Sequence, residues 1–336
     1  MAITIRDVAR RAQVSVATVS RALTTPDLVR AETRSRVLAA ATELGYRPNR
    51  AARGLITGRT GNIGIVVPDL GDPVFTAVLK AAQARAAQAD YAVFVAGGDE
   101  DPATEVKLVH AMAKQVDGVL VCAPASTDEQ VAEAAGATSL VLLDRDLPGV
   151  PAALLDGAGG AEQVVDHLVA LGHRRVAVLD GPRASWSNRQ RRRGLAAARA
   201  RHGVDLVDLG PFAPSYEGGT RAADLALAGD VTAIVAYDDI MASGVLARLR
   251  DRGVPVPGEM SVTGFGDLPY AELCSPPLTT VAVPLAAAGR TAVAMLLAGF
   301  DAQDADVPRV VLPTRLVVRS TTAPPPGPVR PRRDQP

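Results

Sequence analysis

The chain has 336 residues, which is enough for two or three ordinary domains. Hydrophobic residues make up 48% and charged residues 21%, with a formal net charge of zero, which excludes wholesale disorder and a uniformly basic nucleic-acid binder. The two cysteines, Cys122 and Cys274, lie far apart, and we find no metal-ligand spacing, secretory signal or long apolar run. We therefore expect a cytoplasmic protein without a disulfide, metal site, cofactor or membrane partner.

The positive charge is concentrated at the N-terminus. Residues 1–60 contain eleven arginines and four acidic residues, a local net charge of +7, so residues 61–336 carry −7. This asymmetry indicates that any affinity for nucleic acid resides in the first segment.

The N-terminal segment is predicted to form three short helices, over residues 5–12, 16–23 and about 31–44. Thr4, with Asp7 three positions later, is suited to cap the first helix, and Ser15 the second. Gly45 is suited to end the third. Apolar residues at helical spacing are expected to face inward: Val8, Ala12, Val37, Leu38, Ala41 and Leu44.

The second of these helices has the character of a DNA-reading element. In a helix-turn-helix, the second helix enters the major groove with its N-terminal residues at the base edges. Here Val16 and Ala17 can contact thymine methyl groups. Thr18, Ser20 and Arg21 can bond to bases or phosphates. Spacing and charge leave one alternative open, an arginine-bearing helical bundle with no DNA role.

From Asn62 onward, short apolar runs alternate with helical segments, the pattern of parallel sheets covered on both faces. The expected strands are 63–67, 91–95, 118–121, 140–143, 153–155, 176–179, 233–236 and 260–265, followed by 278–283, a helix over 286–297 and a strand at 310–312. So many strands suggest two lobes with a crossover near Gly157. The Pro- and Arg-rich tail from Thr321 is expected to be disordered.

The residues that follow the expected strands are rich in polar and aromatic side chains. They include Asp144, Asp238, Asp267 and the segment GPRASWSNRQRRR. Ligands of open parallel sheets bind beyond the carboxyl ends of the strands. Acids and arginine can hold sugar hydroxyls, and aromatic faces can cover a ring. The pattern therefore predicts a small, polar, hydroxyl-rich ligand.

Two long N-terminal runs read ITIRDVARRAQVSVATVSRAL and VRAETRSRVLAAATELGYRPNRAARGL. Shorter runs in the body of the chain read DGVLV, HLVALGH, DDIMASG, SVTGFGD and SPPLTT. Together these motifs resemble the LacI/GalR family of repressors over almost the whole chain, apart from the tail. The resemblance implies an α/β protein with an N-terminal three-helix helix-turn-helix head. A two-lobed, periplasmic-binding-protein-like (type I) sensor with parallel sheets would follow.

The resemblance also implies domain boundaries. Residues 1–47 would form the DNA-binding domain, 48–60 a hinge helix or linker, 61–320 the effector-binding domain and 321–336 a disordered tail. Within the effector-binding domain, the N-lobe would comprise about 61–156 and 284–312, and the C-lobe about 157–283 and 313–320.

For the partners, the resemblance implies a homodimer on a near-palindromic operator of double-stranded DNA. Leu55 would be the hinge leucine that wedges into the minor groove. Asn49, Arg50 and Arg53 would contact phosphates or the minor groove. Without the resemblance, Leu55 would be interpreted as an ordinary linker residue. The expected DNA-binding residues are Thr4, Ser15, Val16, Ala17, Thr18, Ser20, Arg21, Asn49, Arg50, Arg53 and Leu55.

The positions that match the family's effector site are Asp72, Phe75, Asp144, Arg191, Phe212 and Asp238. Trp186 and Asp267 complete the expected set, with packing as the open alternative for Trp186. Asp239 is expected to cap the following helix. Gly266, Val283 and Asp238 stand where the family commonly has aspartate, glutamine and asparagine. The effector is therefore expected to be a carbohydrate or a derivative of unspecified identity.

Other functional classes fit the sequence less well. A dinucleotide-binding enzyme is disfavoured because no GxGxxG follows the first strand, and neither GxxxxGK[ST] nor GxSxG occurs. A transport-type binding protein would need a signal peptide and would lack a basic helical head. We expect a repressor rather than an activator, although the position of the operator, which the chain does not encode, decides the sign.

Overall fold

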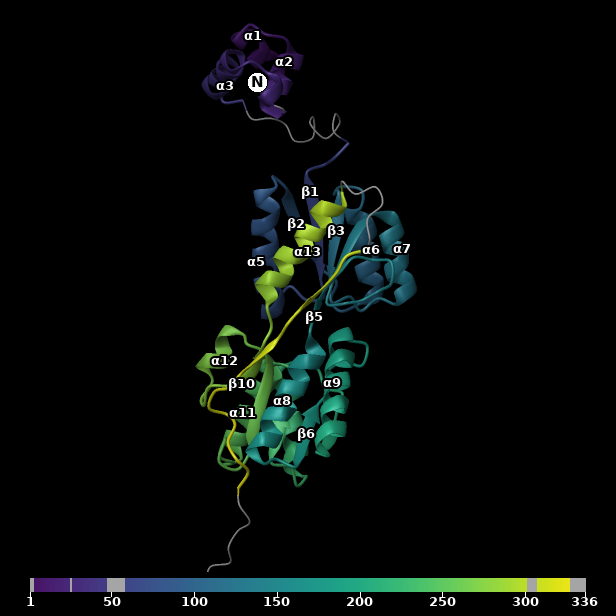
Figure 1. Ribbon diagram of the computed structural model, residues 1–336, viewed down its shortest axis with the longest axis vertical. Coiled ribbons are helices and arrows are strands. Elements are labelled where there is room, and N and C mark those ends of the chain that lie inside the picture. The colour runs from purple at the N-terminus through teal and green to yellow at the C-terminus, as the bar shows by residue number, and fades with distance from the viewer. Residues whose placement is uncertain (1–2, 25, 47–57, 301–306, 327–336) are drawn as a thin grey trace, which may run out of the picture. The chain divides into compact units, whose positions relative to one another are not determined.

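The computed structural model describes residues 3–24, 26–46, 58–300 and 307–326 (Figure 1). The chain divides into two compact units, residues 1–61 and 62–336. The residues expected to form the hinge contacts, Asn49, Arg50, Arg53 and Leu55, lie outside the described residues. None of the described helices is long and apolar enough to span a membrane.

The first unit contains three α-helices, α1 (Ile5–Ala12), α2 (Val16–Thr24) and α3 (Ala31–Leu44), and a 3-10 turn, η1 (Pro26–Leu28). The Asp7 carboxylate accepts hydrogen bonds from the Thr4 amide (3.0 Å) and hydroxyl (2.7 Å), which fixes the start of α1. Gly45 ends α3 with a left-handed φ of 64°. The helix positions predicted from capping residues are confirmed.

One residue of the expected core of this unit was assigned wrongly. Leu38 is 42% exposed, whereas Val37, Ala40 and Ala41 are buried. The buried face of α3 is formed by Val37 and by the residues three and four positions later, Ala40 and Ala41. Leu38, the residue after Val37, is rotated by about 100° around the helix axis and therefore faces away from the core. The core is built from small residues, with Val8, Val19 and Val37 fully buried.

The second unit consists of two lobes, each built on a six-stranded sheet. The N-lobe sheet has the order β11-β5-β4-β3-β1-β2, with β1 (Asn62–Val67), β2 (Ala92–Gly97), β3 (Gly118–Cys122), β4 (Ser139–Leu143), β5 (Ala152–Leu155) and β11 (Arg309–Leu312). The C-lobe sheet has the order β12-β10-β9-β8-β6-β7, with β6 (Arg175–Leu179), β7 (Asp205–Leu209), β8 (Ala233–Val235), β9 (Ser261–Gly266), β10 (Thr279–Ala282) and β12 (Arg315–Val317). The described pairs are parallel except β10 with β12.

Helices cover both faces of each sheet. The N-lobe helices are α5 (Pro73–Gln88), α6 (Pro102–Met112), α7 (Asp128–Ala137) and α13 (Leu285–Gly299). The C-lobe helices are α8 (Gly157–Leu171), α9 (Trp186–His202), α10 (Tyr216–Leu227), α11 (Asp239–Asp251) and α12 (Pro269–Leu273). In the N-lobe, α5 packs on α13 and α6 on α7; in the C-lobe, α8 packs on α9 and α10 on α11. The predicted fold class, a three-helix head and two parallel-sheet lobes, is confirmed.

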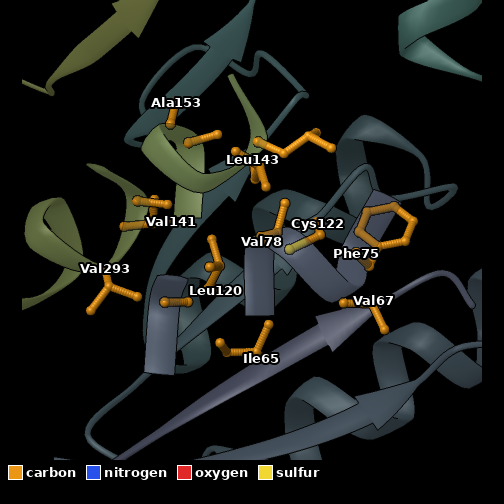
Figure 2. Close-up of a cluster of buried hydrophobic side chains, with 14 of the residues drawn as sticks. Ile65, Val67, Phe75, Val78, Leu120, Cys122, Val141, Leu143, Ala153 and Val293 are labelled. Carbon is orange, nitrogen blue, oxygen red and sulfur yellow. The ribbon is translucent and has the colours of Figure 1, made fainter. Parts of the chain in front are cut away.

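The N-lobe core lies between its sheet and the α5–α13 pair. Figure 2 shows Ile65, Leu120 and Val141 from the strands beside Val78 of α5 and Val293 of α13. The thiol of Cys122 belongs to this cluster, and its burial raises its pKa. Cys122 therefore acts as a small apolar residue of the core.

Two strands were not predicted, β7 and β12. Both lie at an edge of the C-lobe sheet, and their sequences, DLVDL and RLV, are short and carry charged residues. An edge strand is covered on fewer sides, so it lacks the continuous apolar run that identified the central strands.

The expected disorder of the tail is wrong for its first residues. Thr321 is fully buried. Its hydroxyl donates to the Val262 carbonyl (2.6 Å) and accepts from the Thr279 amide (2.8 Å). The Ala323 carbonyl lies 3.0 Å from Nε2 of the buried His173. The segment is held because the Thr321 hydroxyl bonds backbone groups of β9 and β10. The Pro-rich composition of the tail does not reveal these bonds. Residues 327–336 lie outside the described part of the chain.

We predict that Thr321→Val destabilises the second unit by about 1–3 kcal/mol, because the Val262 carbonyl and the Thr279 amide each lose a buried partner. The measurement is the free energy of unfolding in urea. Thr220→Val is the matched control, since the Thr220 hydroxyl donates to the Glu217 carbonyl of its own helix near the surface. Equal stability of the two variants would contradict the anchoring role of Thr321.

Candidate functional site

The N-terminal half of α2 offers an exposed surface to a partner. Val16 is 42% exposed, and Ala17 and Arg21 are also exposed, while Val19 is fully buried and holds the helix to the core. One face of α2 therefore packs against the core, and the opposite face is exposed to solvent. The DNA-binding role of this surface stays a prediction.

Two of the residues expected to contact DNA have a structural role in the unit. Ser15 Oγ accepts a hydrogen bond from the Thr18 amide (3.1 Å), and the two hydroxyls lie 2.8 Å apart. Thr4 donates its hydroxyl to Asp7, as described above. Ser15 and Thr4 thus order the starts of α2 and α1 and remain at exposed positions.

We predict that Ala17→Glu lowers affinity for a cognate operator by about tenfold or more, because it places a carboxylate where base edges and phosphates are expected. The control is Ala39→Glu, which makes the same charge change at an exposed position of α3. Both proteins would be titrated with a duplex selected from a random library, after thermal melts confirm equal folding. Equal losses in the two variants would contradict the assignment of α2 as the reading helix.

The second candidate site is a cavity of about 560 Å³ in the effector-binding domain. Its walls come from loops that follow β1, β3 and β4 of the N-lobe and β6, β8 and β9 of the C-lobe. These are the carboxyl ends of parallel strands, so the two sheets direct their ligand-binding edges at one space.

Arg191 lies at the centre of the described contacts in this cavity. Its guanidinium carbon lies 3.8 Å from the centroid of the Phe265 ring and 4.5 Å from that of Tyr237. One terminal nitrogen donates to the Tyr237 carbonyl. Its Nε is buried and has no hydrogen-bond partner among the described residues. Aromatic stacking thus orients the Arg191 cation at the cavity wall.

A glycine three residues further along α9 permits this placement. A Cβ at Gly194 would lie 2.1 Å from the carbonyl oxygen of Ala158, well inside van der Waals contact. The absence of a side chain allows α9 to approach the first turn of α8. Arg191, one turn earlier on α9, is brought to the cavity wall by this approach.

Asp144 connects the two lobes across the cavity. It follows β4 in the N-lobe with a φ of 54°, and its carboxylate accepts a hydrogen bond from the Ser187 hydroxyl of α9 in the C-lobe. Burial raises the pKa of Asp144, while the Ser187 hydrogen bond and the positive charge of Arg191 act in the opposite direction. The carboxyl is therefore a buried acceptor within reach of a bound molecule.

Asp72 and Asp238 are cavity carboxylates that also cap helices. Asp72 accepts from the Val74 amide (2.8 Å) at the start of α5, and Asp238 from the Met241 amide (2.7 Å) at the start of α11. Burial raises the pKa of Asp238 to about 6, and the neighbouring Asp239 and Asp72 charges add to that effect.

The expectation that Asp239 caps α11 is wrong. Asp238 occupies the cap position, and Asp239 is the first helical residue. The Asp239 carboxylate is buried and accepts from the Thr280 hydroxyl and the Leu268 amide (2.9 Å). Asp239 therefore ties α11 to β10 and to the segment that follows β9.

Of the eight expected effector residues, five line the cavity: Asp72, Phe75, Asp144, Arg191 and Asp238. Three are absent from the described lining. The Trp186 ring is stacked by two guanidinium groups, with the Arg145 and Arg189 carbons 5.9 and 5.4 Å from its centroid. Phe212 packs against the C-lobe core, and Asp267 forms an ion pair with Arg319 (2.7 Å).

Sequence reasoning missed several polar residues of the lining, among them Ser187, Gln190 and Tyr237. Gln190 has a buried Nε2 without a partner among the described residues. All three lie in segments that follow β6 and β8, so the strand-end rule located the segments. It could not tell which side chains along them face inward.

We predict that Asp238→Asn stabilises the ligand-free protein at neutral pH, because burial penalises only the charged carboxyl and asparagine can still cap α11. Folding raises this pKa from 3.8 to about 6. The increase in the free energy of unfolding should therefore be absent below about pH 4 and grow up to about pH 6. Above that pH it should stay at about 1–3 kcal/mol.

The measurement is urea unfolding of wild type and variant across this pH range, with the exposed Asp230→Asn as control. A gain that does not change with pH would contradict the burial of an ionisable Asp238.

Comparison with known proteins identifies the family of this chain. The family model described as "Bacterial regulatory proteins, lacI family" matches residues 4–49, and that of a periplasmic binding protein-like domain matches residues 165–322. The transcriptional regulator GalS of Salmonella typhimurium is 36% identical over 306 residues, which cover 88% of this chain and 90% of GalS. The transcriptional repressor CytR of Escherichia coli is 31% identical over 333 residues, 96% of each chain.

Solved structures agree with this relationship. The fold is similar to that of the lac repressor dimer bound to operator and the anti-inducer ONPF, with a TM-score of 0.86 and 29% identity over 96% of this chain and all of that one. The complex of the regulator CelR with cellobiose matches with a TM-score of 0.71 and 29% identity, over 95% of this chain and 99% of CelR. This chain belongs to the LacI family of DNA-binding transcriptional regulators and carries a periplasmic-binding-protein-like effector domain.

Proposed function

We propose that this regulator is a repressor whose affinity for a near-palindromic operator is controlled by a small polar effector, a sugar or a sugar derivative. One observation carries the proposal. Five residues predicted from the sequence to bind an effector line a single cavity, with the stacked Arg191 on its C-lobe wall. Carboxylates and a guanidinium converging on an enclosed space suit a molecule with several hydroxyls.

The relatives support this assignment. CytR is named a repressor, the lac repressor was solved as a dimer with operator and anti-inducer, and CelR was solved with cellobiose. A dimer suits an operator whose half-sites are related by a two-fold axis. We therefore propose that two copies of this chain bind one operator.

Control of DNA binding requires that the effector favours one arrangement of the lobes. The cavity has walls from both lobes, and Asp144 already bonds Ser187 across it. A molecule that contacts both walls stabilises the arrangement in which both contacts form. It shifts operator affinity only by its difference in affinity for the two arrangements.

We predict that Arg191→Ala removes the effector response and leaves operator affinity in the absence of effector within about twofold of wild type, because the lost stack and donor lie in the sensor. The control is Arg199→Ala, which removes an exposed arginine from the same helix. A thermal-shift screen of sugars and polyols on the wild-type chain supplies the effector, since a ligand of the folded state raises its melting temperature.

Operator titrations with and without that effector then compare the three proteins. An Arg191→Ala protein that still responds to the effector, at similar concentrations, would contradict the placement of the effector in this cavity. Loss of the response in both variants would assign it to general damage of α9.

A further inference from the structure

The walls of the effector cavity are strongly acidic. Six carboxylates and one cationic side chain occur among the described lining residues: Asp69, Asp72, Glu100, Asp144, Glu217 and Asp238, with Arg191. That described lining contains no lysine or histidine. The imbalance is greatest on the N-lobe side, where burial raises the pKa of Asp72 and the negative charges of Asp69 and Glu100 raise it further.

Arg191 does not balance this charge. It is stacked on Phe265 and bonded to the Tyr237 carbonyl, so its position is fixed on the C-lobe wall. Its positive charge acts on Asp144 and on Asp238, the two acids of the described lining that are closest to full burial. Asp72, on the opposite lobe, has no cation among the groups that set its pKa.

Asp72 and Asp238 lie on different lobes and line the same cavity. Burial is the main cause of the raised pKa of Asp238, and the negative charge of Asp72 adds to it, so the two carboxylates repel each other across the cavity. Each uses one oxygen to cap a helix. A carboxylate has two oxygens that accept several bonds, so both groups keep acceptor capacity for a ligand.

A metal ion does not account for these acids. The described residues contain no group of three or more His, Cys, Asp or Glu side chains placed to hold one ion. The carboxylates are instead distributed over a cavity of about 560 Å³, the size range of small-molecule sites. The charge is arranged for an extended ligand rather than a point ion.

We propose that the effector is a hydroxylated molecule that carries a protonated amine, held between Asp72 of the N-lobe and Asp238 of the C-lobe. This inference rests on the proposed function of the cavity as the effector site. A neutral sugar can donate hydrogen bonds to the same carboxylates, but it leaves their mutual repulsion in place. An ammonium group both donates to them and offsets their charge, and charge-assisted bonds are the stronger kind.

The amine also supplies a reason for the lobes to close. Without a cation, Asp72 and Asp238 repel each other and disfavour the approach of the two walls. A positive charge between them turns that repulsion into two attractions, which are strongest in the closed arrangement. The charge of the ligand thus becomes the source of its differential affinity for the two arrangements.

The test uses the full chain and matched sets of compounds: glucose, glucosamine and N-acetylglucosamine, and the same three forms of galactose and mannose, with sorbitol and its 1-amino derivative. Thermal shift selects binders, and calorimetry gives dissociation constants. The best amine should bind about tenfold or more tightly than its acetylated counterpart, the difference expected from a charged hydrogen bond. Its affinity should fall as salt rises from about 50 to about 500 mM.

Two variants locate the effect. Asp72→Asn and Asp238→Asn should each weaken binding of the amine about tenfold and change binding of the neutral forms much less. Asparagine preserves both helix caps, so these proteins should fold. Asp230→Asn, at an exposed position outside the cavity, is the matched control and should bind the amine like wild type.

Neutral sugars that bind as tightly as their amines, or a preference for acidic sugars, would overturn the inference. So would the absence of a thermal shift with every amine, since the charge should attract an amine even on an imperfect ring. A different outcome would contradict the proposed function of the cavity. It is contradicted if a ligand of the cavity, charged or neutral, leaves operator affinity unchanged.

Discussion

The parallel order of the strands in both lobes is the constraint on which the cavity of about 560 Å³ depends. Asp72, Asp144 and Arg191 are far apart in the chain, and each follows the carboxyl end of a different strand. Because these ends meet at one edge of each sheet, and the two edges face a common space, the three side chains are brought together. A single antiparallel reversal among the central strands would move one of them to the opposite edge.

The acids of the cavity are held in place by the same bonds that build the helices. Asp72 and Asp238 cap α5 and α11, so each carboxylate is held at the cavity wall of its own lobe and cannot turn away from the cavity without loss of a cap. The raised pKa of Asp238 is the cost of this arrangement. Sites that bind ligands commonly retain such charge conflict, because the ligand relieves it.

Much of the architecture could be predicted because local signals were strong. Thr4, Asp7 and Gly45 mark helix ends by their own chemistry, and continuous apolar runs marked the central strands. The failures share a physical cause, a dependence on distant partners. Thr321 is ordered by β9 and β10, and Asp239 turns toward Thr280 instead of capping its helix. The strand-end rule found the segments of the cavity, but it placed Trp186 and Asp267 there although Arg145, Arg189 and Arg319 engage them elsewhere.

The account joins a basic head to an acidic sensor and requires that binding at one site changes affinity at the other. The most direct measurement is reciprocal. Operator affinity is measured with and without saturating effector, and effector affinity with and without operator, on the same full-length protein. The account predicts that both ratios differ from one and are equal, because linkage makes the coupling free energy common to the two sites. A ratio of one in either experiment would contradict it.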